Sequence, residues 1–272
     1  MKRRNFLGIT TSALAVSFLD AHRLFAFSGC AVKDKTSAEQ PFIKTLRLQT
    51  ACSFAEMKKF YSETIGLPVA NESKNELTIQ GGETKITFEY INQKDYRPFY
   101  HFAFNIPENK IQKAFEWQRK KTQVLHPNPV GPRDAITDFP HWNAHSIFFL
   151  DPAGNLLEYI ARHDLKNAAD GDFTSRDILY ASEIGFITDD IEGDGKNLLD
   201  ALALKEYRSA SPGFWPIGDE HGLLLMIGKG KIWSSNPGQI NKTDVFKTEV
   251  TINKKVGDKW MLPNHPYSIT SG

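Results

Sequence analysis

The chain has 272 residues, of which 40% are hydrophobic and 24% are charged. This composition is typical of a folded globular protein and argues against intrinsic disorder. The 33 Lys and Arg residues nearly balance the 32 Asp and Glu residues, so no global field attracts nucleic acid or anionic lipid. We therefore expect a small-molecule partner bound in a pocket and no nucleic-acid partner.

Residues 1–30 have the pattern of an export signal. A basic start precedes a short apolar stretch from Phe6 to Leu19, which is too short for a membrane-spanning helix. The Arg3-Arg4 pair followed by Phe6 resembles a twin-arginine (Tat) signal peptide, so we expect export to the periplasm or the cell envelope. Cys30 is a candidate lipid attachment point, and signal cleavage without lipid fits the residues equally well.

Residues 31–42 lack apolar periodicity and are expected to form a linker. The segment TLRLQT, from Thr45, alternates apolar and polar residues as a strand does. Ser53 opens a predicted helix with Glu56 in capping-box spacing, and Gly66 ends it. Two short extended pieces and the strand KITFEYI follow, so the predicted order is β-α-β-β-β.

The same order recurs between residues 101 and 163, where a tight turn at Asp151-Pro-Ala-Gly-Asn155 joins two strands. Two copies of one unit predict a domain at residues 43–164. The expected fold class is α+β, with tandem βαβββ modules that form curved mixed sheets and helices on their outer face.

A third, less regular copy predicts a second, incomplete domain at residues 178–256, followed by a C-terminal tail at 257–272. Its first strand, SEIGFITDD, has Ser182, Ile184 or Phe186 near the positions that correspond to the candidate ligands of the first two units. Glu183 and Glu249 are isolated in the sequence. We therefore expect this half to be a metal-free partner that packs on the first domain or covers its pocket.

Strand parity selects three candidate metal ligands in the first two units. His101, Glu89 and Glu158 each lie on the strand face opposite the apolar set. If the two units form one curved sheet, these side chains project into a common cavity, where carboxylates need a partner. A divalent cation is the obvious partner, and one imidazole with two carboxylates suits Fe, Mn, Zn or Ni.

The segment FPHWNAHSIFF brings two more histidines, His141 and His145, to the strand beside Glu158. Pairing across the turn sets Phe148 on the same face as Glu158, which turns His145 toward the opposite face, although a one-residue shift would reverse this. These histidines either make local hydrogen bonds or coordinate the metal ion together with His101 and Glu158, and the sequence leaves both alternatives open.

Three segments, KKFYSETIGLPV, YHFAFNIPEN and above all FFLDPAGNLLEYIAR, resemble the vicinal oxygen chelate superfamily of glyoxalases, bleomycin resistance proteins and extradiol dioxygenases. The resemblance covers residues 43–163 and, more weakly, 181–252. In metal-using families each unit supplies a ligand from its first strand and another from its last. The resemblance thus implies His101 and Glu158 as ligands from the second unit, and Glu89 as a ligand or catalytic proton acceptor from the first.

The remaining ligand position of the family pattern, on the strand starting near Thr45, holds Thr45 or Lys44, with Gln49 as a further candidate. The leading hypothesis is a metal-dependent lyase, isomerase or ring-cleaving dioxygenase that binds its substrate through vicinal oxygens. The alternative is a metal-free small-molecule-binding protein of the bleomycin-resistance type, with Trp117, Trp142 and Phe148 lining its pocket. A homodimer is left open.

Overall fold

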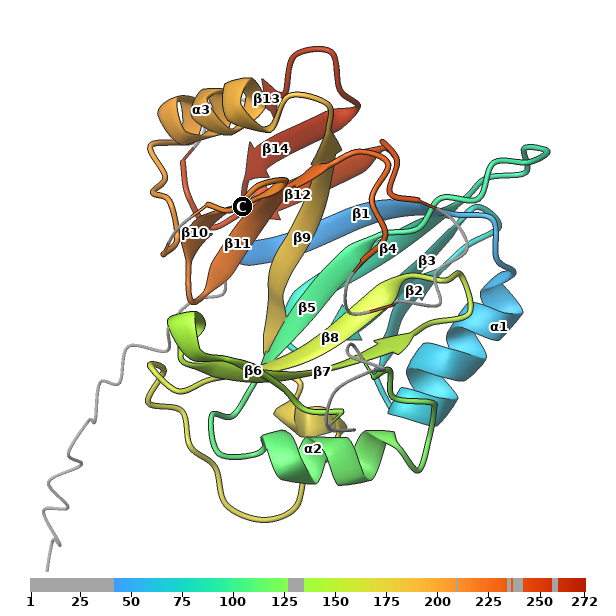
Figure 1. Cartoon of the computed structure of the whole chain (residues 1–272). Helices are drawn as coiled ribbons and strands as arrows, with labels where there is room; N and C mark the ends of the chain where they lie inside the picture. The colour runs from blue at the N-terminus through green and yellow to red at the C-terminus, as the bar shows by residue number, and fades with distance from the viewer. Residues whose placement is uncertain (1–41, 127–134, 209, 234–235, 237–241, 256–258) are drawn as a thin grey trace, which may run out of the picture. The chain divides into compact units, whose positions relative to one another are not determined.

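In the computed structural model, residues 42–126, 135–208, 210–233, 236, 242–255 and 259–272 are described. Their strands form two seven-stranded mixed sheets (Figure 1). Sheet A has the order β13 (Trp260–Met261), β14 (Tyr267–Ser271), β12 (Thr248–Ile252), β1 (Ile43–Thr50), β4 (Thr84–Tyr90), β3 (Glu76–Gly81) and β2 (Val69–Glu72). Sheet B has the order β10 (Phe214–Asp219), β11 (Gly222–Gly228), β9 (Tyr180–Thr188), β5 (His101–Ile106), β8 (Leu156–Arg162), β7 (Ala144–Leu150) and β6 (Thr137–Phe139).

Helices are few and short. Helix α2 packs on β7 and β8, and α3 packs on β10 and β11. The described helical segments are α1 (Phe54–Lys58), the π-helix η1 (Lys59–Ile65), α2 (Ile111–Gln118), the 3-10 turns η2 (Pro140–Trp142) and η3 (Ser175–Asp177), and α3 (Ile191–Leu202). The predicted α+β class with βαβββ modules and curved mixed sheets is confirmed.

The two sheets repeat one pattern of pairing. In sheet A, β1 lies between β4, which is parallel to it, and β12, which is antiparallel. In sheet B, β5 lies in the same way between parallel β8 and antiparallel β9. Four units therefore make the fold, and the first pairs with the fourth while the second pairs with the third.

This pairing differs from the sequence expectation in two respects. The first two units, expected to form one curved sheet within residues 43–164, are distributed between sheet A and sheet B. Residues 257–272, expected as a tail, contain β13 and β14, which complete sheet A beside β12. Contacts between strands distant in sequence decide both points, and the pattern of one strand does not encode them.

One face of each sheet turns toward a shared apolar core, and helical side chains such as Met57 and Ala114 join it. Because side chains alternate along a strand, the opposite face of each sheet carries the polar residues. The core residues from the two central strands and their parallel neighbours include Leu46, Leu48, Ile86, Phe88, Phe102, Phe104, Leu157 and Tyr159.

Local signals determine the ends of the first helical segment. The Ser53 hydroxyl accepts a hydrogen bond from the Glu56 amide, and Ser53 Oγ donates to the Glu56 carboxylate at 2.6 Å. Gly66 ends η1 in the left-handed region at φ 88°, which glycine adopts without strain. The predicted cap and stop are confirmed.

Asp151 holds the turn between β7 and β8. Its buried carboxylate accepts hydrogen bonds from the backbone amides of Ala153 and Asn155, both at 2.9 Å, and from the Tyr61 hydroxyl at 2.7 Å. Asn155 in turn accepts a 2.8 Å hydrogen bond from the amide of Tyr100, just before β5. One carboxylate therefore connects the turn, a helical segment and the start of the central strand.

We expect Asp151→Ala to lower the free energy of unfolding by about 3 kcal/mol, because several buried donors lose a charged acceptor. Chemical denaturation monitored by circular dichroism measures this. The matched control is Glu63→Ala, which removes an exposed carboxylate from η1. Equal stability of the two variants would contradict the role given to Asp151.

Candidate metal centre

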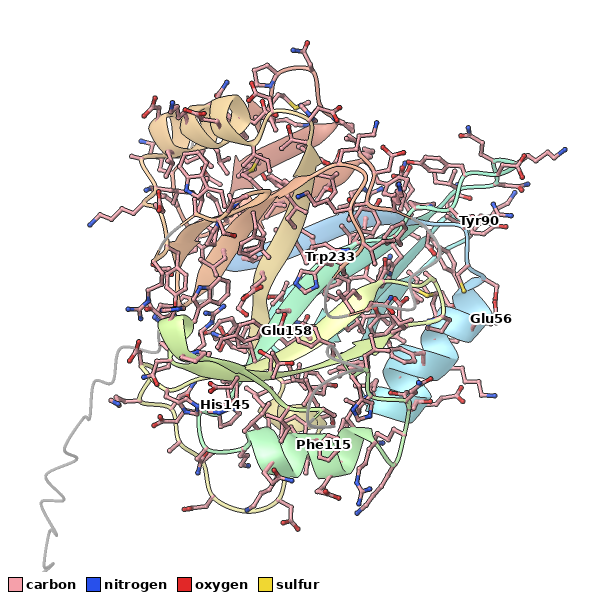
Figure 2. All side chains as sticks on the ribbon, in the orientation of Figure 1. Glu56, Tyr90, Phe115, His145, Glu158 and Trp233 are labelled. Carbon is pink, nitrogen blue, oxygen red and sulfur yellow. The ribbon has the colours of Figure 1, made fainter. Side chains whose placement is uncertain are left out.

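His101, Glu158 and Glu183 meet on the polar face of sheet B. Ala103 on β5 lies opposite Glu158 on β8 and opposite Glu183 on β9. His101 precedes Ala103 by two residues and shares its face. Three neighbouring strands thus direct an imidazole and two carboxylates over a single methyl group. Figure 2 labels Glu158 of this group.

The three side chains are close together and buried. His101 Nε2 lies 3.4 Å from Glu158 Oε2 and 3.7 Å from Glu183 Oε2. One donor atom from each residue lies within 4.8 Å of the other two. The exposed fractions are 5% for His101, 4% for Glu158 and 2% for Glu183, so solvent reaches little of any of the three residues.

A backbone carbonyl fixes the orientation of the imidazole. His101 Nδ1 lies 3.1 Å from the carbonyl oxygen of Leu156, which can only accept a hydrogen bond. Nδ1 therefore carries a proton, and in the neutral ring Nε2 directs its lone pair at two carboxylates. Such an arrangement requires positive charge between the groups, supplied by a proton or by a metal ion.

Without a metal ion, the cluster retains protons. Burial, and then the neighbouring charge of Glu183, raises the pKa of Glu158 to about 8. Burial opposes ionisation of His101, but its hydrogen bond to Glu183 and the charge of Glu158 raise the pKa of its imidazole above the usual value.

Arg162 holds the other oxygen of Glu183. Its guanidinium pairs with Glu183 Oε1 and donates through Nε to Asn105 Oδ1 at 3.2 Å. The guanidinium carbon also lies 5.4 Å from the ring centre of Trp142 and 5.6 Å from that of Tyr207. Because Arg162 uses Oε1, Glu183 Oε2 stays directed at His101.

Aromatic side chains wall the cluster. The rings of Trp233 and His101 have centres 4.7 Å apart. A pocket of about 270 Å³, part of it open to solvent, reaches His101 beside Trp233, Phe246 and Tyr267. An approach from solvent to the imidazole therefore passes an aromatic surface.

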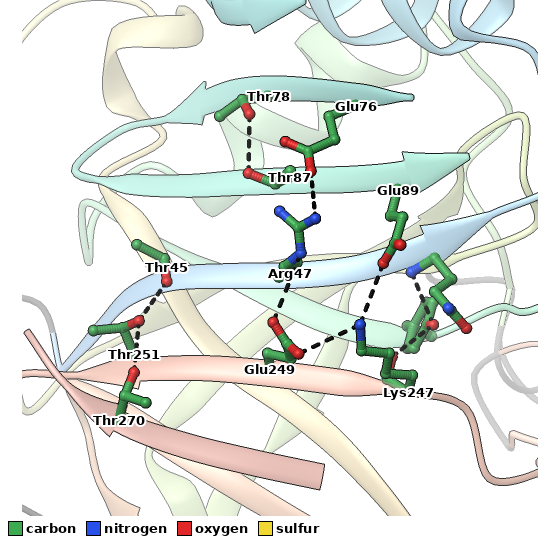
Figure 3. Close-up of polar contacts among 12 residues, drawn as sticks. Thr45, Arg47, Glu76, Thr78, Thr87, Glu89, Lys247, Glu249, Thr251 and Thr270 are labelled. Carbon is green, nitrogen blue, oxygen red and sulfur yellow. Dashed lines mark hydrogen bonds and ion pairs between the residues drawn. The ribbon is translucent and has the colours of Figure 1, made fainter. Parts of the chain in front are cut away.

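Glu89 does not join this cluster, contrary to the expectation that it shares a cavity with His101 and Glu158. It lies on β4 in sheet A, where its Oε2 is 3.4 Å from Lys247 Nζ (Figure 3). The pairing of the units explains the difference, because the first unit contributes to the other sheet. The structure brings His101 and Glu158 together and leaves Glu89 out, which removes the basis for a catalytic or ligand role of Glu89 at this centre.

Glu183, interpreted from sequence as isolated, is the residue that the sequence reasoning missed. Alternate residues of the strand SEIGFITDD face opposite sides, and from the sequence we placed Ser182, Ile184 and Phe186 on the side of the possible ligands. In the structure Ile184 and Phe186 face the apolar core, so Glu183 faces the polar side. The apolar set of this strand was the signal that could have identified Glu183.

His145 points away from the centre. Phe148 pairs with Glu158 across the turn, as predicted, and His145 pairs with Ala161, which faces the apolar core. His141 is exposed on η2. Neither histidine completes the set of His101 and Glu158.

Sheet A carries a different arrangement at the equivalent position. Arg47 on β1 lies opposite Thr87 on β4 and Glu249 on β12, as Ala103 lies opposite Glu158 and Glu183. Its guanidinium pairs with Glu76 and lies 3.7 Å from Glu249 (Figure 3). Sheet A thus has the guanidinium of Arg47 at the position where sheet B has the methyl group of Ala103.

Residues 47–159 match the model of the Glyoxalase/Bleomycin resistance protein/Dioxygenase superfamily. This part of the chain is therefore similar to that superfamily. The fold is similar to that of a candidate dioxygenase from Bacillus subtilis (TM-score 0.54, 14% identity, covering 79% of this chain and 72% of that one). It is also similar to a mutant of glyoxalase I from Zea mays (TM-score 0.50, 14% identity, covering 85% and 92%).

No curated protein sequence matches the chain. Among the helices of the described residues, none has the length and apolar character that crossing a membrane requires.

For the metal-free chain, we expect the free energy of unfolding to fall as pH rises from about 5 to about 8. In the unfolded chain Glu158 loses its proton near its ordinary pKa of 4.5, whereas the folded chain retains that proton to about 8. The folded state binds more protons in this window, so its stability is greatest below the window and is lost through it. The raised pKa of His101 acts in the same direction, above its ordinary value of 6.5.

Urea denaturation at several pH values, with chelator present, measures this slope. Glu158→Gln should flatten it, whereas Glu89→Gln on sheet A should leave it unchanged. A wild-type stability that rises across the window would show that the cluster does not hold the extra protons.

Proposed function

We propose that this protein binds a divalent metal ion through His101, Glu158 and Glu183 and acts on a small molecule through two neighbouring oxygens. The supporting observation is the convergence of three buried donor atoms within 4.8 Å of one another. The superfamily match of residues 47–159 agrees with this class of function.

The residues present fit a metal ion. In the neutral ring, Nε2 of His101 carries a lone pair because Nδ1 carries the proton and donates a hydrogen bond to the Leu156 carbonyl. Glu158 Oε2 and Glu183 Oε2 face the same point, and Ala103 leaves room above the strand. One imidazole and two carboxylates suit Fe, Mn, Zn or Ni.

When bound, a divalent metal supplies Lewis-acid stabilisation of negative charge on substrate oxygens. The protein groups have separate tasks. Arg162 orients Glu183 through Oε1, so that Oε2 faces the site. The ring of Trp233 lies against the imidazole and forms part of the pocket through which a small molecule would approach. Lyase, isomerase and ring-cleaving dioxygenase reactions all use such a centre, and we propose this group of reactions.

One observation favours the alternative, a metal-free binding protein of the bleomycin-resistance type. Arg162 already pairs with Glu183, and a protonated His101 would balance Glu158. The cluster would then be a buried ion network beneath an aromatic pocket. Metal content separates the two functions.

We also propose that the protein is exported to the periplasm or the cell envelope by a twin-arginine signal. The support is the sequence of residues 1–30, which lie outside the described part of the chain. Lipid attachment at Cys30 and signal cleavage without lipid are the two alternatives for the end of this signal.

We expect protein purified without chelator to contain about one equivalent of a divalent metal bound by the buried cluster. The His101→Ala, Glu158→Ala double variant should lose it, and Glu183→Gln should weaken binding by at least tenfold, because each change removes a donor. Elemental analysis after dialysis gives the content, and competition with a metallochromic chelator gives the affinity.

Glu89→Gln is the matched control, since it removes a carboxylate from the polar face of the other sheet and should retain the metal. Circular dichroism establishes that each variant is folded. Equal metal content in the wild type and the double variant would reject the metal-dependent function and favour the metal-free alternative.

A further inference from the structure

A second group of polar side chains lies on the opposite face of sheet B. Asp138 on β6 lies directly opposite His145 on β7. His163 follows β8, and its amide donates to the carbonyl of Asn143, which extends the β7–β8 pairing by one residue on each strand. Because this pairing makes His163 a diagonal neighbour of His145, neighbouring strands place an Asp and two His side chains on one face.

The two imidazoles approach each other closely. His145 Nδ1 lies 2.8 Å from His163 Nε2, and the ring planes are inclined by 68°. His145 Nε2 lies 3.6 Å from Asp138 Oδ1. The exposed fractions of the His145 and Asp138 side chains are 39% and 62%, so an ion from solvent can reach them.

The carboxylate determines which nitrogen of His145 is available. Negative charge beside Nε2 favours the tautomer with its proton there, which leaves a lone pair on Nδ1 facing His163. A carboxylate in contact with the far nitrogen of an imidazole is the usual outer-shell support of a metal-binding histidine.

We propose that His145 and His163 form a binding site for Cu(II) or Ni(II), supported by Asp138 and completed by water. Two nitrogens that each lie about 2.0 Å from an ion, at a right angle, are about 2.8 Å apart. The observed separation of 2.8 Å, which in the metal-free chain is a hydrogen bond between the two rings, also matches adjacent positions in a tetragonal complex. A tetrahedral zinc site would require about 3.3 Å.

This site is independent of the buried centre. Glu158 pairs with Phe148, whose side chain occupies the polar face, and His145 lies three residues away with the opposite orientation. Changes at one site should not alter the ligands of the other. The surface site also does not depend on the enzymatic function proposed for the cluster of His101.

The test is a titration of the full chain, without a histidine tag, with Cu(II) alone. Isothermal calorimetry measures the affinity, and electron paramagnetic resonance detects nitrogen ligands. We expect His145→Ala and His163→Ala each to weaken one binding event at least tenfold and to remove one of the two coordinated imidazoles from the spectrum. Asp138→Asn should weaken the same event about tenfold while both nitrogens remain bound.

Two controls separate this site from other copper ligands. His141→Ala removes an exposed histidine from the adjacent turn and should leave the event unchanged. Glu158→Gln should also leave it unchanged, whatever its effect on the buried centre. If His145→Ala destabilises the fold, His163→Gln keeps the size of the side chain and removes the ring nitrogen.

Copper affinities of the folded His145 and His163 variants that equal that of His141→Ala would overturn the proposal. A spectrum without imidazole nitrogen in the wild type would do the same. In either case the two rings only share a proton.

Discussion

The position of β5 between β8 and β9 is the constraint on which the buried centre depends. It places Ala103 opposite an acidic residue on each side, so two carboxylates converge over the smallest side chain of the strand. His101 comes from the same strand, and the Leu156 carbonyl directs its free nitrogen at both carboxylates. The chemistry of this face therefore follows from the pairing of two units that are separate in sequence.

The two sheets share one strand order but differ in how their acidic residues are compensated. In sheet A the guanidinium of Arg47 rises from the central strand and lies between Glu76 and Glu249. In sheet B Arg162 approaches from the neighbouring strand and occupies one oxygen of Glu183. The other oxygen of Glu183, Oε2, and the carboxylate of Glu158 stay directed at His101. Sheet B therefore has carboxylate oxygens that could bind a further cation.

The two faces of sheet B hold two different histidine environments. His101 is enclosed with carboxylates in the interior, whereas His145 and His163 meet at the solvent-accessible end of the other face. Burial makes the interior cluster sensitive to net charge, because unpaired charges are costly there. At the surface, water supplies the remaining ligands that an ion needs.

Local patterns in the sequence by themselves determined the β-α-β-β-β order of the first two units, the Ser53 cap, the turn from Asp151 to Asn155 and the pairing of Phe148 with Glu158, because each depends on neighbouring residues. The sequence also selected His101 and Glu158 as candidates. Only the tertiary structure decided that Glu183 joins them and that Glu89 does not. That choice depends on which units share a sheet, and such pairing between distant strands leaves no periodic signal in either one.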